Sequence, residues 1–127
     1  MRSLWADRLI DAPAAALWKL LTDTEAWPEW GPSIRAVTSD SGRWIGAGAT
    51  GSVTTAIGIT LPFVVTRFAD ERGWSWRVAG VAATDHSVEA IDADRCRVGF
   101  GVPWPAAPYL AICRVALGRL ATMAERR

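Results

Sequence analysis

The sequence predicts an α+β fold in which a curved antiparallel sheet wraps around a long C-terminal helix, with two short helices after the first strand. Three observations predict it. Apolar residues recur at helical spacing between positions 14 and 21. Short apolar segments between positions 34 and 102 are separated by turn residues at regular intervals. From position 109 the helical period returns. A length of 127 residues fits one domain, residues 1–127.

The N-terminal part reads as a strand followed by two short helices. Ser3 to Ile10 contains enough apolar residues for one strand. Pro13 stands where a helix has its first residue, a place that tolerates its fixed φ and missing N–H. Asp23 is placed to cap a second short helix, and Pro28 is expected to break that helix after Trp27. The apolar face of the first helix consists of Ala14, Leu17, Trp18 and Leu21.

The middle of the chain reads as an antiparallel meander. Its expected strands span residues 34–38, 50–57, 59–68, 74–78, 81–91 and 96–102, with turn residues between them. Pro62 suggests an edge position or a bulge in the third of these strands. The last strand alternates most clearly, so Val98 and Phe100 share one face.

Prolines at positions 103, 105 and 108 precede the final helix. Its apolar residues fall on one face, which predicts that this face packs against the sheet. They are Tyr109, Ile112, Cys113, Ala116, Leu117, Leu120, Met123 and Ala124.

Composition excludes several classes of protein. A net charge of +1 without a basic stripe argues against nucleic-acid binding. No apolar run approaches the ~20 residues of a membrane span, and the first residues lack a signal-peptide pattern, so we expect a cytoplasmic protein. The single histidine, and two cysteines within apolar patterns, predict no metal site and no cofactor.

Three segments resemble a known superfamily. They are Ile10-Asp-Ala-Pro13 with Leu17-Trp18, Thr22-Asp23 and Trp27-Pro-Glu-Trp-Gly-Pro32; Trp74-Ser-Trp76 before a strand bearing His86; and the Arg95-Cys-Arg-Val98 strand running into the final helix. Over nearly its whole length the sequence resembles the START/birch-pollen-allergen (SRPBCC) superfamily, and within it the polyketide cyclase/dehydrase and lipid transport family. The resemblance implies a helix-grip fold around an internal cavity that binds a small hydrophobic molecule.

Strand alternation selects the candidate ligand-binding residues. His86 shares the more apolar face of its strand with Thr84 and Val88. It is either a polar group of the pocket or a core histidine bonded to a backbone carbonyl. Trp74 and Trp76 also face inward, where they line a pocket or fill the core. The other candidates are Trp44, Arg67 (with a solvated position as its alternative), Val98, Phe100, Tyr109, Cys113 and Leu117.

Three functions remain open at this stage. The first is binding of a small hydrophobic or aromatic molecule, with aromatic walls and His86 as a polar handle. The second is a cyclase or dehydratase acting on a polyketide-like substrate, with His86 as acid/base and Thr84 beside it. No partner for His86 is visible, so whether the protein is an enzyme stays undecided. The third is an interaction module whose groove takes a protein segment or a second copy, giving a homodimer.

Overall fold

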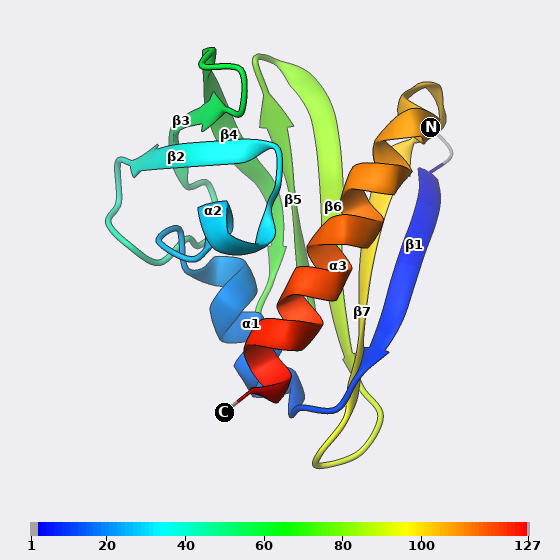
Figure 1. The fold of residues 1–127 in the computed structure, drawn as a ribbon. Coiled ribbons are helices and arrows are strands. Elements are labelled where there is room, and N and C mark those ends of the chain that lie inside the picture. The colour runs from blue at the N-terminus through cyan, green and yellow to red at the C-terminus, as the bar shows by residue number, and fades with distance from the viewer. Residues whose placement is uncertain (1–2, 127) are drawn as a thin grey trace.

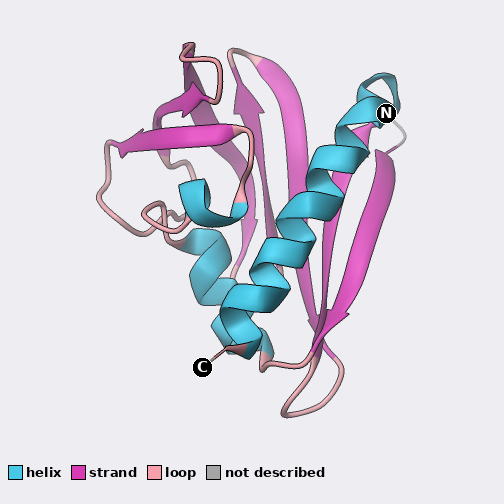
Figure 2. Cartoon of the chain, viewed as in Figure 1, coloured by secondary structure: helices cyan, strands magenta, loops and turns pink. Residues whose placement is uncertain are grey.

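The computed structural model describes residues 3–126 and shows a curved antiparallel sheet with helices on its concave face (Figures 1 and 2). The sheet has seven strands in the order β1-β7-β6-β5-β4-β3-β2. They are β1 (Ser3–Ile10), β2 (Ile34–Ser39), β3 (Thr50–Thr55), β4 (Thr60–Ala69), β5 (Gly73–Val78), β6 (Val81–Ala90) and β7 (Cys96–Pro103). The helices are α1 (Ala14–Thr22), α2 (Trp27–Trp30), the 3₁₀ segment η1 (Trp104–Tyr109) and α3 (Leu110–Glu125). The predicted α+β architecture and order of elements are confirmed.

The chain order explains the sheet order. Strands β2 to β7 form a meander in which every strand pairs with the next. The first strand then pairs with the last along its whole length, from Ser3 opposite Pro103 to Ile10 opposite Cys96. Helices α1 and α2 connect β1 to β2, which lie at opposite edges of the sheet.

The two short helices are joined by indole hydrogen bonds. Trp27 Nε1 donates to the carbonyl of Leu21, and Trp30 Nε1 donates to the carbonyl of Leu20, each at 2.9 Å. Carbonyls at a helix C-terminus lack partners within the helix, so these indoles satisfy the end of α1 while they enter the core.

Two details of this region differ from the sequence-based prediction. Pro28 does not break a helix after Trp27, because α2 starts at Trp27 and Pro28 lies in its first turn. A missing N–H costs no helical hydrogen bond there. Asp23 does not cap α2; it follows the end of α1, and its carboxylate accepts hydrogen bonds from the Glu25 backbone and from Arg43.

Of the two alternatives for the strand that contains Pro62, the edge position is wrong, because β4 lies between β3 and β5. The strand does have an irregularity, but it lies beyond Pro62, where the β4–β5 register shifts between Val65 and Arg67. An inserted residue reverses which side chains face inward. Phe68 therefore follows Val65 on the inner side, 5.5 Å from the ring of Trp18.

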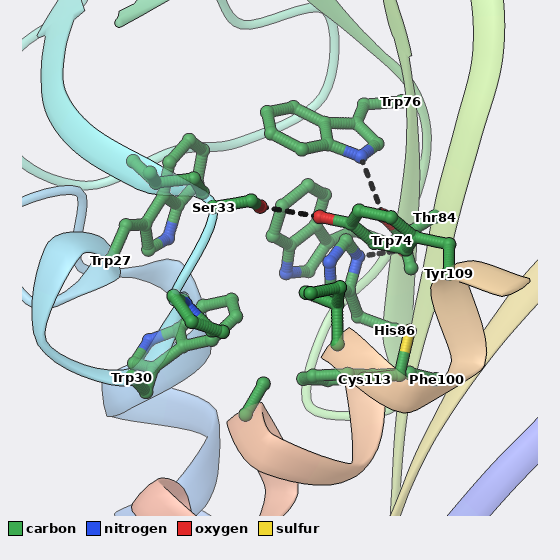
Figure 3. A pocket seen from close by; sticks show the side chains of 15 residues that line it. Trp27, Trp30, Ser33, Trp74, Trp76, Thr84, His86, Phe100, Tyr109 and Cys113 are labelled. Carbon is green, nitrogen blue, oxygen red and sulfur yellow. Dashed lines mark hydrogen bonds between the residues drawn. The ribbon is translucent and has the colours of Figure 1, made fainter. Parts of the chain in front are cut away.

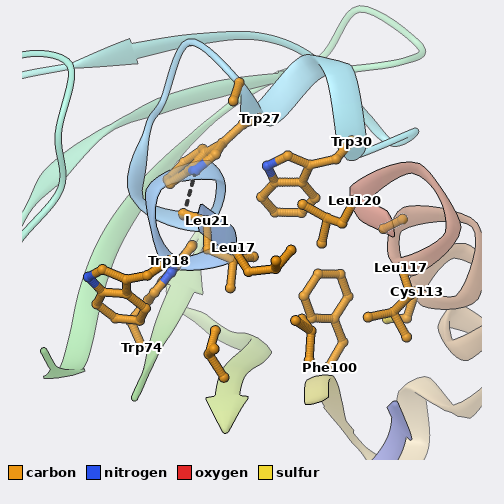
Figure 4. Close-up of a cluster of buried hydrophobic side chains, with 14 of the residues drawn as sticks. Leu17, Trp18, Leu21, Trp27, Trp30, Trp74, Phe100, Cys113, Leu117 and Leu120 are labelled. Atoms are coloured by element: carbon orange, nitrogen blue, oxygen red, sulfur yellow. Dashed lines mark hydrogen bonds between the residues drawn. The ribbon is translucent and has the colours of Figure 1, made fainter. Parts of the chain in front are cut away.

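The core lies between the sheet and the helices (Figure 4). Helix α3 packs against β1 and β7 with the face that the sequence predicts. Its first predicted residue, Tyr109, belongs to η1 instead, and α3 starts at Leu110. Within residues 3–126, no helix has both the length and the apolar character needed to cross a membrane. The buried residues of α3 are Cys113, Ala116, Leu117, Leu120, Ala121 and Ala124.

Candidate functional site

A groove of about 550 Å³ opens at one end of the sheet. Its walls are residues of the segments 53–61, 76–84 and 102–109, with Ser33 and Ile34 from the start of β2. These segments contain the β3–β4 turn, the β5–β6 turn and η1, which lie together at the top of Figure 1. No lining residue carries a charge. Both the size and the apolar walls are typical of a small-molecule site.

Exposed apolar side chains lie in or next to the segments that form the groove. Ile57, which lines it, is 81% exposed; Val81 and Trp104, which adjoin lining residues in the sequence, are 67% and 61% exposed. Turns of soluble proteins normally present polar residues, so these side chains favour a contact surface or the entrance of a ligand site.

A second, inner cavity of about 30 Å³ lies deeper, between α2, α3 and the sheet (Figure 3). Its walls include Trp30, Trp74, His86, Phe100 and Cys113. The volume admits a water-sized molecule and no larger ligand.

Five residues line both cavities and form what we call the partition: Ser33, Ile34, Trp76, Thr84 and Tyr109. Four of them are paired by hydrogen bonds, drawn as dashed lines in Figure 3. The hydroxyls of Ser33 and Tyr109 lie 2.5 Å apart, and Trp76 Nε1 donates to Thr84 Oγ1 at 3.4 Å. Burial raises the pKa of Tyr109, so its phenol stays protonated. The partition is therefore polar but uncharged.

His86 lies behind the partition in a cluster of aromatic rings. Its imidazole stacks on Trp74 with centroids 3.8 Å apart, and Phe100 approaches its edge at 5.1 Å. Nδ1 is 3.2 Å from the Trp74 carbonyl oxygen. Burial lowers the pKa of His86 to about 3, against a smaller opposing effect of that carbonyl. The ring is neutral at pH 7 and has no proton to give as a general acid.

Trp74 fills the centre of the same cluster. It stacks with Trp27 at 5.2 Å as well as with His86, and Trp76 meets it edge-on at 5.5 Å. Its Nε1 is buried and has no hydrogen-bond partner within residues 3–126. Aromatic packing occupies most of the space around His86 and the two indoles and leaves only the inner cavity there, while the larger hollow lies on the outer side of Trp76.

The predicted site residues fall into four groups. Trp76, Thr84 and Tyr109 line the groove. Trp74, His86, Phe100 and Cys113 line the inner cavity only. Val88, Val98 and Leu117 are buried in the core and line neither cavity. Trp44 and Arg67 are exposed and line neither.

Both exposed residues have a local explanation. Arg67 would share the inner face with Phe63 and Val65 under strict alternation, but the register shift after Val65 places it outside. Trp44 pairs with Asp23 in an isolated bridge, and the Arg43 guanidinium lies 5.1 Å from its ring centroid. Neither side chain faces the groove or the inner cavity.

Sequence reasoning missed most of the groove wall. The missed residues are small or β-branched side chains in the β3–β4 turn, at the start of β6 and in η1, including Ile57, Ile59, Ala82, Ala83 and Ala106. One signal was present in the sequence: isoleucines flank the turn glycine Gly58, where polar residues are usual.

The two cysteines are buried thiols. Cys96 and Cys113 are free and buried, and burial raises the pKa of Cys113 to about 11, so neither is a ready thiolate. Within residues 3–126, no three His, Cys, Asp or Glu side chains gather where they could hold a metal ion.

Comparison with known proteins identifies the family. Residues 1–125 match the family model described as polyketide cyclase / dehydrase and lipid transport. The chain belongs to this family. No curated protein matches the sequence.

Solved structures of the family's fold are similar over almost the whole chain. XoxI from Bacillus cereus is 17% identical with a TM-score of 0.74, covering 98% of this chain and 96% of its own. The Zhui aromatase/cyclase from Streptomyces sp. R1128 is 16% identical with a TM-score of 0.72, covering 99% and 94%. The di-domain aromatase/cyclase BexL from the BE-7585A biosynthetic pathway is 18% identical with a TM-score of 0.72, covering 95% of this chain and 45% of its own. At these sequence identities, similarity to the solved structures shows the fold alone. It is the helix-grip fold that the sequence resemblance to the superfamily implied.

Proposed function

We propose that this protein binds a small hydrophobic or aromatic molecule in the groove. The observation that carries the proposal is a hollow of about 550 Å³ whose walls contain no charged residue. Apolar surface left in contact with water is costly, and a cavity of this size is rarely left open in a small domain without a use. Membership of a family described by polyketide cyclisation and lipid transport supports the same class of ligand.

A cyclase or dehydratase function has less support. It is favoured by the likeness to two aromatase/cyclases. However, the acid/base that it needs, His86, is neutral, bonded to a backbone carbonyl and separated from the groove by the partition. Thr84 reaches the groove, but a threonine hydroxyl alone is a poor acid or base at neutral pH.

The third function, association through the groove with a protein segment or a second copy, is favoured by the exposed apolar residues in or next to the segments that form the groove. It predicts dimers or larger complexes, which light scattering of the purified protein would detect. A monomer that binds small apolar molecules supports the first proposal over this one.

A filled groove tests the proposal. Ala83 lines the groove and lies in β6, so Ala83→Phe adds a ring to its interior. Ala90 lies in the same strand, is exposed and does not line the groove, so Ala90→Phe is the matched control. The probe is N-phenyl-1-naphthylamine, an uncharged molecule that fluoresces in apolar surroundings.

We expect saturable binding by the natural protein, unchanged binding by Ala90→Phe, and affinity reduced about tenfold or more by Ala83→Phe, because the ring occupies the space of the ligand. Native mass spectrometry of the freshly purified protein would identify a molecule that it already carries. Equal binding by both variants would contradict the proposal, as would the absence of saturable binding to the natural protein.

A further inference from the structure

The polar side chains of the groove are few, and most of them belong to the partition. Side-chain oxygen or nitrogen donors come from Ser33, Trp76, Thr84 and Tyr109 of the partition and from Thr55 at the end of β3. The Thr55 hydroxyl accepts a hydrogen bond from the Ile59 N–H in the β3–β4 turn and, like Thr84, keeps its own hydrogen. A ligand that fills the groove therefore meets most of its polar groups at the partition.

Counting hydrogens shows what the partition can donate. Two hydroxyls bonded to each other use one hydrogen, so the pair of Ser33 and Tyr109 keeps one hydrogen to donate, whichever of the two donates to the other. Thr84 accepts from Trp76 and keeps its own hydroxyl hydrogen. Thr84 is buried, whereas Tyr109 is 37% exposed and Ser33 is half-buried, so a ligand at the partition would replace water on the hydrogen of that pair.

The charge of the walls limits which acceptor fits. Neither cavity is lined by Lys or Arg, and no charged residue lines the groove. A carboxylate would accept both hydrogens, but it would lose its hydration in an apolar groove without a cation to compensate. A ketone, ester or similar uncharged oxygen would accept them without that cost.

We propose that the partition, through the hydroxyls of Ser33, Tyr109 and Thr84, selects ligands that present an uncharged oxygen acceptor to it. This inference rests on the proposed function and narrows its ligand class. These hydroxyls would then determine specificity. Shape complementarity and burial of the ligand in the groove supply most of the affinity, and the partition discriminates among molecules of equal shape.

Three naphthalenes of similar shape test it: 2-ethylnaphthalene with no polar group, 2-acetylnaphthalene with a ketone, and 2-naphthoate, which is ionised at pH 7. Their affinities are measured by isothermal titration calorimetry on three proteins. The first is the natural chain. The second is the double variant Ser33→Ala/Tyr109→Phe, because a single change leaves the other hydroxyl its hydrogen. The third is Thr55→Val, a control that removes a groove-lining hydroxyl outside the partition.

The natural protein should bind 2-naphthoate about a hundredfold or more weakly than the ketone. The ratio of ketone affinity to hydrocarbon affinity should fall about fivefold in the double variant and stay unchanged in Thr55→Val. Unchanged affinity of the double variant for 2-ethylnaphthalene would show that its groove is intact.

Two results overturn the inference alone: equal affinity for ketone and carboxylate, or a ketone-to-hydrocarbon ratio that the double variant leaves unchanged. If the natural protein binds none of the three molecules, the proposed function falls and this inference falls with it.

Discussion

His86 should make the stability of this protein depend on pH between 5 and 7. Its pKa is about 3 in the folded chain, where burial among Trp74, Phe100 and neighbouring rings disfavours the charged form, and 6.5 is its ordinary value. The unfolded chain therefore binds a proton more readily than the folded chain. The stabilisation is fully present above pH 6.5 and is lost as the pH falls from 6.5 toward 3.

The size of the effect follows from the two pKa values. A pH of 5 is 1.5 units below the ordinary pKa of 6.5, so His86 is protonated in the unfolded chain, while in the folded chain it is still almost wholly neutral. One pH unit corresponds to about 1.4 kcal/mol, so the free energy of unfolding should be about 2 kcal/mol lower at pH 5 than at pH 7. Carboxylates contribute little in this window, because their ordinary pKa values lie near 4.

Urea unfolding at pH 7 and pH 5, followed by tryptophan fluorescence, measures this difference. His86→Phe keeps an aromatic ring in the cluster and removes the titrating group. His86 is the only histidine, so no other imidazole confuses the comparison. We expect the natural chain to lose about 2 kcal/mol more than the variant between the two pH values. Equal pH dependence of the two proteins would refute the reasoning and would mean that His86 is solvated.

Two further predictions concern the scaffold. Gly118→Ala should raise the free energy of unfolding by up to about 1 kcal/mol, because the added methyl group in α3 meets no atom within 4 Å. Gly51→Ala should lower the free energy of unfolding by more than that, because its Cβ would collide with the backbone of β2. Thermal unfolding of both variants checks these opposite signs. Asp23→Asn should lower the urea midpoint of unfolding, because Arg43 donates two hydrogen bonds of 2.8 Å to the Asp23 carboxylate. Asp92→Asn should leave the urea midpoint unchanged, because the ion pair of Asp92 with Arg95 is exposed.

The architecture was readable from the sequence because each element carries its own period. The strand at 96–102 and the final helix bury the faces that alternation and helical spacing predict. The register shift after Val65 was not readable, since it arises from pairing with β5 and leaves no local signature. That shift places Arg67 on the outer face, the solvated alternative that the sequence left open.

The site was predicted only where it coincides with the core pattern. Periodicity places three groove residues on inward-facing strand positions or at the start of the last helix, so the sequence predicted them: Trp76, Thr84 and Tyr109. The outer wall was missed because it is made of strand ends and turns, where periodicity carries no information. Whether inward aromatic rings enclose a space or fill it depends on distances between strands remote in sequence, such as the 3.8 Å stack of Trp74 and His86.

The partition separates two parts of the fold that differ in packing. Behind it, buried rings pack against one another, so a substitution there disturbs many contacts at once. In front of it, the groove wall is built from strand ends and turns, which tolerate substitution better. A library confined to residues 55–61 and 78–83 is therefore expected to retain the fold while the shape of the groove changes.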